Sequence, residues 1–95
     1  MKWTIDFDRN ASRFLRKSKD LSKTKIIQLI LEVLHKFKGR EINVDVRKMA
    51  GAWKGFYRIK KGKTRVIIKI DFDKKWVYVD KIDFRGKFTK NKFIY

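Results

Sequence analysis

The stretch "GFYRIKKGKTRVIIKI", from Gly55 to Ile70, decides the fold. Apolar and polar residues alternate in both of its halves, as in strands that bury one face, and Lys61–Gly62 supplies a two-residue turn between them. A third strand-like run follows the turn-forming sequence "DFDKK". The three runs predict an antiparallel meander with strands over 53–60, 63–70 and 76–84.

The predicted hairpin places like charges side by side. Arg58 lies opposite Arg65, and Lys60 lies opposite Lys63, with all four side chains on one face of the sheet. Like charges in direct cross-strand pairs are destabilising, and the segment 46–70 contains nine Lys or Arg and no acid. A polyanion resting on this face would relieve the repulsion, since phosphates and stacked bases favour a cation-lined, partly apolar surface.

A simpler explanation applies to some of these cations. Lys61, Lys63 and Lys69 are suited to be solvated strand residues that protect a sheet against edge-to-edge aggregation. That explanation fits Arg58 and Arg65 poorly, because the planar guanidinium group is suited to bidentate phosphate contact. We therefore expect a function for the two arginines.

Composition limits the class of protein. Ninety-five residues with 43% hydrophobic and 15% aromatic content predict one domain with a modest core. The net charge of +17 favours polyanionic partners. There is no cysteine, hence no disulfide or thiolate metal site, and no apolar run long enough to span a membrane. We expect a soluble, cytoplasmic protein without a membrane partner.

The first half of the chain predicts one strand and two helices. Residues 2–7 alternate like a strand, and Asp8 can cap a helix over 9–17. A longer helix follows from a cap at Asp20 or Ser22 to about Phe37, where Gly39 closes it. A short strand is expected near 44–46. The fold class is α+β: an N-terminal strand and a two-helix hairpin packed on one face of a small, mainly antiparallel sheet that ends in the three-stranded meander.

The sequence resembles the RelE/ParE superfamily of bacterial and archaeal toxins. The resemblance is carried by "KMAGAWKGFYRIKKGKTRVIIKI" followed by "YVDKIDFRG", and "WTIDFDRNASRFLRK" fits the opening strand and first helix of the family. It spans Met1 to about Phe88 and implies a single RelE-like toxin domain over residues 1–95, with a flexible tail over 89–95.

What the resemblance implies is the toxin of a type II toxin–antitoxin system, a ribosome-dependent endoribonuclease that cleaves mRNA in the A site and inhibits translation. Carried onto this sequence, the family pattern places the catalytic set at Arg58, Lys60, Arg65 and Arg85. Five further lysines and one aromatic residue are expected to bind RNA: Lys54, Lys61, Lys63, Lys69, Lys87 and Phe88.

The expected tyrosine is missing. Relatives usually place it a few residues after the last-strand arginine, where this chain has Phe88. Tyr95 is the next hydroxyl and would substitute only if the tail folded back, while Tyr57 and Tyr78 are expected to be buried.

His35 lies in the long predicted helix and is expected to be non-catalytic. No carboxylate pair, metal cluster or cofactor motif accompanies the cations, so we expect no metal or cofactor and a site that acts by positioning and phosphate stabilisation.

Two alternatives stay open. The ParE branch comprises non-enzymatic DNA gyrase inhibitors that lack the catalytic set, and a catalytically weak nucleic-acid-binding member of the fold is also compatible with the sequence.

The expected partners are a cognate antitoxin with an acidic, amphipathic segment, the ribosome and mRNA. The toxin alone is expected to be monomeric.

Overall fold

The computed structural model describes residues 2–84. Within them, five strands and two α-helices follow one another in the expected order, with one added 3-10 turn. The elements are β1 (Thr4–Phe7), α1 (Arg9–Lys17), α2 (Lys23–Phe37), β2 (Asp45–Lys48), the 3-10 turn η1 (Gly51–Trp53), β3 (Phe56–Lys61), β4 (Thr64–Asp71) and β5 (Trp76–Phe84). Arg85, Lys87, Phe88 and Tyr95, and the tail expected over 89–95, lie outside the described residues.

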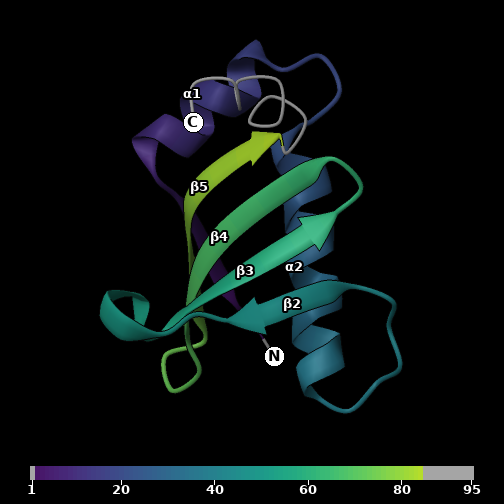
Figure 1. The fold of residues 1–95 in the computed structure, drawn as a ribbon, viewed down its shortest axis with the longest axis vertical. Helices are drawn as coiled ribbons and strands as arrows, with labels where there is room; N and C mark the ends of the chain where they lie inside the picture. The colour runs from purple at the N-terminus through teal and green to yellow at the C-terminus, as the bar shows by residue number, and fades with distance from the viewer. Residues whose placement is uncertain (1, 85–95) are drawn as a thin grey trace.

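The strands form one mixed sheet in the order β1-β5-β4-β3-β2 (Figure 1). β1 pairs with β5 in parallel, whereas β2 to β5 pair in antiparallel fashion. In the view of Figure 1, α2 runs behind β2, β3 and β4, which turn their other face to the reader. The α+β class, the C-terminal meander and the placement of the helices on one face are confirmed.

Local sequence explains where the helices begin and end. The Asp8 carboxylate accepts a hydrogen bond from the Asn10 amide at 2.9 Å, which caps α1. For α2, Ser22 is the cap that the structure uses, and its hydroxyl accepts from the Lys25 amide at 3.3 Å. Gly39 follows the end of α2 with φ of +95°, a left-handed conformation that favours glycine.

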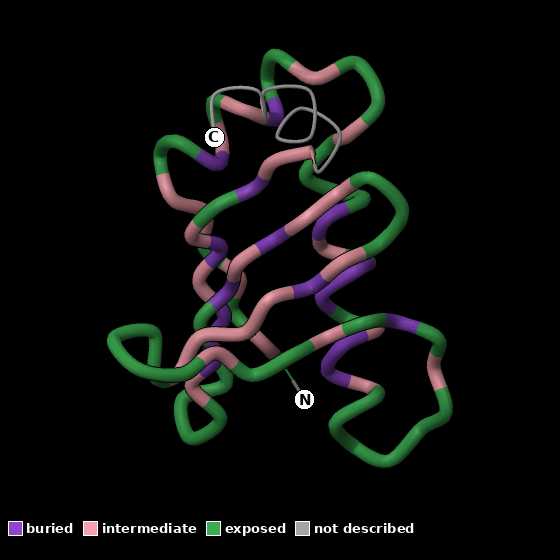
Figure 2. Tube along the Cα trace, in the orientation of Figure 1, coloured by how far each residue is buried: buried purple, intermediate pink, exposed green. Residues whose placement is uncertain are grey.

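The core lies between the helices and the inner face of the sheet (Figure 2). It is built from aliphatic side chains at helical spacing in α2 and at alternate positions in the central strands. A bulge keeps β5 in phase with this core, because Ile68 pairs with Val79 while Ile67 pairs with Lys81, leaving Asp80 as the extra residue. The fully buried large side chains are Ile26, Ile30, Val33, Ile59, Val66, Ile68, Val77 and Val79.

The predicted register of the hairpin is wrong by a small shift. Gly62 and Lys63 form the turn, with φ of +59° at Gly62, so the glycine occupies the first central position, as in a type II′ turn. Arg58 therefore lies opposite Ile67 rather than Arg65. Because its partner moves by two positions, every strand side chain keeps its predicted face. The faces were predicted correctly, but the cross-strand pairs were not.

The start of the meander also differs from the prediction. Gly51–Trp53 forms the 3-10 turn, and Gly55 follows with φ of +91°, so β3 begins at Phe56 and not at Trp53. No helix among residues 2–84 is long and apolar enough to cross a membrane.

Candidate nucleic-acid interface

The outer face of the sheet is the face that points away from α1 and α2. Side-chain alternation places Arg58 and Lys60 of β3 and Arg65 of β4 there, since their neighbours Ile59 and Val66 are fully buried on the inner face. Three of the four residues predicted to be catalytic are therefore on one surface, in two adjacent strands. The fourth, Arg85, lies outside the described residues.

One row across the outer face contains both signs of charge. Asp45, Lys60, Arg65 and Asp83 lie opposite one another on β2, β3, β4 and β5. Nε of Arg65 is 3.3 Å from Oδ1 of Asp83, and the two side chains are only 28% and 19% exposed. The expectation that no acid relieves these cations is thus wrong, because the acids come from the two flanking strands. The Asp83 contact fixes the orientation of the Arg65 guanidinium group.

The next row carries the excess positive charge. Arg47 of β2 lies opposite Arg58 of β3, and Ile67 of β4 lies between Arg58 and Lys81 of β5. The cross-strand neighbours of these cations are therefore an apolar residue or another cation. Arg47 also contacts Asp45, at 3.6 Å, but these side chains are 71% and 50% exposed, and such a pair contributes little. We call Arg47, Arg58, Ile67 and Lys81 the basic row.

Arg47 was missed by the sequence reasoning. It and Arg58 line one side of a hollow of about 370 Å³ that is completed by the segment 48–50. The signal was present in the alternation of Asp45, Val46 and Arg47, which places both charged residues on the same face. Recognising it required knowing that β2 pairs with β3.

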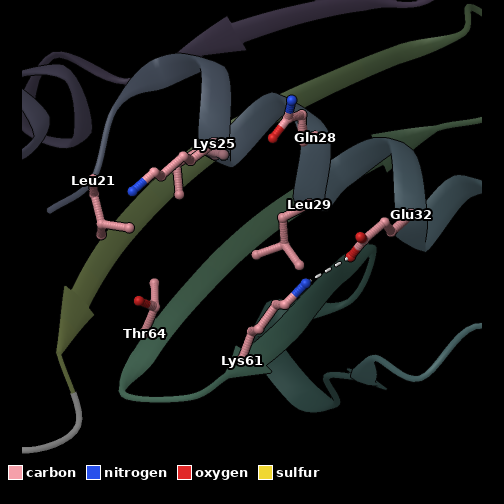
Figure 3. A pocket seen from close by; sticks show the side chains of 8 residues that line it. Leu21, Lys25, Gln28, Leu29, Glu32, Lys61 and Thr64 are labelled. Atoms are coloured by element: carbon pink, nitrogen blue, oxygen red, sulfur yellow. Dashed lines mark hydrogen bonds and ion pairs between the residues drawn. The ribbon is translucent and has the colours of Figure 1, made fainter.

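The lysines predicted to bind RNA are spread over the molecule. Lys61 points to the helix side, where Nζ lies 3.1 Å from Oε1 of Glu32 in α2, across a hollow between α2 and the hairpin (Figure 3). Lys63 lies in the turn, not opposite Lys60, and Lys54 is exposed just after η1. Lys69 is on the outer face, where its ammonium group lies 5.6 Å from the ring centre of Phe56. Lys87 and Phe88 are outside the described residues.

Tyr78 is on the outer face and half-buried, which corrects the expectation that it is buried in the core. Its hydroxyl donates a 2.6 Å hydrogen bond to Oδ1 of Asp8, the residue that caps α1. This hydrogen bond raises the pKa of Tyr78 to about 12 and lowers the pKa of Asp8. Tyr78 therefore stays protonated at neutral pH and is not suited to act as a base. Tyr57 packs against Phe37 on the helix side.

A pH titration tests this network. The raised pKa of Tyr78 in the folded chain means that its contribution to stability is complete below pH ~10, the value for an unperturbed tyrosine, and is lost as the pH rises through about 12. We expect the ultraviolet absorbance of tyrosinate in the native protein to show one late step near pH 12. The Tyr78→Phe variant should lack that step, and a late step that survives in it would contradict the assignment.

Asp8 gives the opposite dependence at acid pH. The pKa of the Asp8 carboxyl is lowered in the folded chain. Its contribution to the stability of the fold is therefore present above the ordinary pKa range of a carboxyl group and is lost as the pH falls through its pKa in the folded chain. In Asp8→Asn, the acid-induced fall of the melting temperature should be shallower than in the wild type. Equal slopes in thermal melts recorded between pH 5 and pH 2 would show that the carboxylate adds no stability.

Metal ligands do not gather near these residues. Across residues 2–84, no three His, Cys, Asp or Glu side chains are grouped so that they could hold a metal ion. His35 lies in α2, on the helix side of the sheet. What the outer face offers is guanidinium and ammonium groups above an apolar floor, an arrangement that can bind a phosphodiester chain.

Comparison with solved structures places this arrangement in a known fold. The archaeal RelE–RelB complex from Pyrococcus horikoshii contains a chain that superposes with a TM-score of 0.66 at 20% identity, over 92% of this chain and 99% of that one. The chain has the fold of the RelE toxins. A chain of the RelBE2 toxin–antitoxin complex from Mycobacterium tuberculosis gives 0.57 at 19% identity, over 90% and 100% of the two chains. The E. coli DinJ–YafQ complex gives 0.62 at 11% identity, over 90% and 97%.

The RelE-like fold is shared without close sequence similarity. No protein-family model matches the sequence, and no curated protein matches it either. The likeness in fold agrees with the family resemblance carried by the strand and helix pattern. The candidate catalytic residues therefore follow from the geometry of the outer face of this chain.

Proposed function

We propose that the chain is the toxin of a toxin–antitoxin system and cleaves mRNA on the ribosome. The observation that carries the proposal is the basic row, with Arg58 at its centre, on the face of a RelE-like sheet that points away from α1 and α2. Cations concentrated on a sheet face favour the binding of a ribose-phosphate chain. The solved neighbours include toxin–antitoxin complexes, which supports the same role.

The reaction we propose is attack by the RNA's own 2′-hydroxyl. The 2′-oxygen loses its proton and forms a bond to phosphorus while the bond from phosphorus to the 5′-oxygen breaks. The 5′-oxygen takes a proton from solvent water, which leaves a cyclic phosphate and a 5′-hydroxyl. Arg58 is assigned to the developing charge on the phosphate oxygens. Arg65, oriented by Asp83, positions the same phosphate. Lys60, which lies between Asp45 and Arg65, is our candidate for accepting the 2′-proton in its neutral amine form. Arg85, which lies outside the described residues, stays a predicted member of the catalytic set.

Salt dependence provides one test of phosphate binding. Binding to a short single-stranded RNA should weaken linearly on a logarithmic plot against salt, by ~0.7 log units per neutralised phosphate for each tenfold rise in salt. Arg58→Ala should reduce the slope by about one phosphate contact. An unchanged slope, measured by fluorescence anisotropy with a 2′-O-methyl oligonucleotide that cannot be cleaved, would remove Arg58 from the RNA site.

Cleavage itself is tested with purified ribosomes programmed with a defined mRNA. We expect cuts at codon-defined positions in the A site, mapped by primer extension, and little cleavage of the same mRNA without ribosomes. Intact mRNA together with trapped, cleaved DNA–gyrase complexes would instead favour the ParE-like activity. Intact mRNA with unaffected gyrase would indicate a nucleic-acid-binding protein that has neither activity.

A cognate antitoxin is part of the proposal. The solved neighbours include toxin–antitoxin complexes with RelB and with DinJ, and a net charge of +17 favours an acidic partner. We propose that an acidic, amphipathic antitoxin segment covers Arg58 and Arg65. If adding the antitoxin left mRNA cleavage unchanged, this partner would not act on the outer face.

A further inference from the structure

We infer that the outer face holds a base-stacking site for single-stranded RNA at the end of the strands away from Lys60 and Arg65. The site is formed by Phe56, Lys69, Trp76 and Tyr78. We call these four residues the aromatic row. The inference rests on the proposed function in taking RNA as the ligand, and it adds a second contact region that the catalytic assignment does not require.

The aromatic row crosses three strands. Phe56 of β3 lies opposite Lys69 of β4, which lies opposite Tyr78 of β5. Trp76 stacks on Tyr78, with ring centres 5.6 Å apart and planes inclined by 27°. Trp53, which is 42% exposed, packs edge-on against Phe56 at 5.1 Å. Aromatic rings alternating with a cation on a sheet face that the described helices leave open form a surface on which unpaired bases stack.

Hydrogen bonds hold two of these rings by their edges. The indole nitrogen Nε1 of Trp76 donates to Oδ2 of Asp6 at 2.7 Å, and the Tyr78 hydroxyl donates to Asp8. Since both polar atoms are engaged by carboxylates, the rings have a fixed orientation and present apolar faces. Fixed rings lose little conformational freedom when a base stacks on them.

A hollow beside Trp76 gives room for a base. It measures about 530 Å³ and is lined by Thr4, Lys69, Asp71, Lys74 and Trp76. The two lysines can contact the phosphates on either side of the base. Asp71 already accepts a hydrogen bond from the Lys74 amide at 3.0 Å, so this carboxylate has a structural role in the turn. The negative charge of Asp71 disfavours phosphate at the centre of the hollow, which leaves that place to the base.

The aromatic row continues the proposed cleavage site along the strands. Lys69 follows Arg65 by four residues in β4, a separation of ~13 Å at ~3.3 Å per residue. One extended RNA strand can therefore contact both regions. A protein partner fits the row less well, because lysine is depleted at the centre of protein interfaces and four of the five side chains around the hollow are polar.

Stacking can be separated from charge with two oligonucleotides of equal length and charge. One carries bases on a 2′-O-methyl backbone, and the other is abasic at its central positions. We expect the wild type to bind the base-bearing strand about tenfold more tightly. Trp76→Leu should lose most of that preference, and Trp76→Phe should keep part of it. Lys69→Ala should weaken both strands alike and lower the salt slope.

Phe37→Leu is the matched control, because Phe37 is an aromatic residue on the helix side and, at 40%, is more exposed than the half-buried Trp76. It should keep the full preference for bases, and thermal melts should confirm that each variant is folded. Equal binding of the two strands by the wild type, or an undiminished preference in Trp76→Leu, would overturn the inference. A Trp76 side chain that the antitoxin shields from solvent, but that RNA does not shield, would also overturn the inference. A base preference that persists in a protein unable to cut mRNA on ribosomes would contradict the proposed function and leave the stacking site standing.

Discussion

Arg58→Ala is expected to lower the rate of mRNA cleavage on programmed ribosomes by about 100-fold or more, which is typical when one preorganised donor to a developing oxyanion is removed. Arg58 is the centre of the basic row, between Arg47 and Ile67. Arg65 lies in the neighbouring row, where Asp83 contacts it. Primer extension over a time course measures the rate.

Two variants make this result specific. Arg58→Lys keeps the charge and loses the planar fork, so it should restore binding to RNA better than it restores the cleavage rate. Lys61→Ala removes a cation from the same strand on the opposite side of the sheet, where it contacts Glu32, and should cut at nearly the wild-type rate. If Lys61→Ala lost as much activity as Arg58→Ala, total charge and not the outer face would explain the reaction.

Ile30→Ala is expected to destabilise the fold by about 2–5 kcal/mol, since it removes a large side chain from the middle of the core. Ile30 is 0% exposed in α2, the helix that covers the inner face of the sheet. For a domain of this size the melting temperature should fall by ~4–8 °C per kcal/mol. Calorimetry or circular dichroism measures the shift.

The adjacent residue supplies the control. Leu31 belongs to the same helix but is 41% exposed, so Leu31→Ala should change stability by no more than about 0.5 kcal/mol. Similar losses in the two variants would mean that the inner face of α2 is not the face that carries the core.

The sequence predicted the elements well where periodicity was strong. Helix α1 and strand β5 have the predicted ends, and α2 begins after one of the two caps considered, because a serine hydroxyl can reach the amide three residues on. The 3-10 turn at Gly51–Trp53 was missed because tryptophan and the following aromatic residues continue a strand-like pattern, whereas Gly55 breaks it with positive φ.

The candidate site was predicted less completely, for a physical reason. Alternation along a strand assigns a face, and the faces of Arg58, Lys60 and Arg65 follow from it. Cross-strand neighbours depend on register and on strands distant in sequence, so neither Arg47 beside Arg58 nor Asp83 beside Arg65 could be read from the hairpin alone. Tyr78 was expected to be buried, but its alternation with the buried Val77 and Val79 places it on the outer face.

The outer face as the RNA-binding surface is tested most directly by isoleucine methyl NMR during titration with a non-cleavable single-stranded RNA. Ile67 lies on the outer face beside Arg58, while Ile68 next to it is fully buried and Ile26 lies in α2. Our account predicts that the Ile67 methyl signal moves progressively and that those of Ile68 and Ile26 stay nearly still. A titration that shifts Ile26 and leaves Ile67 unchanged would contradict it.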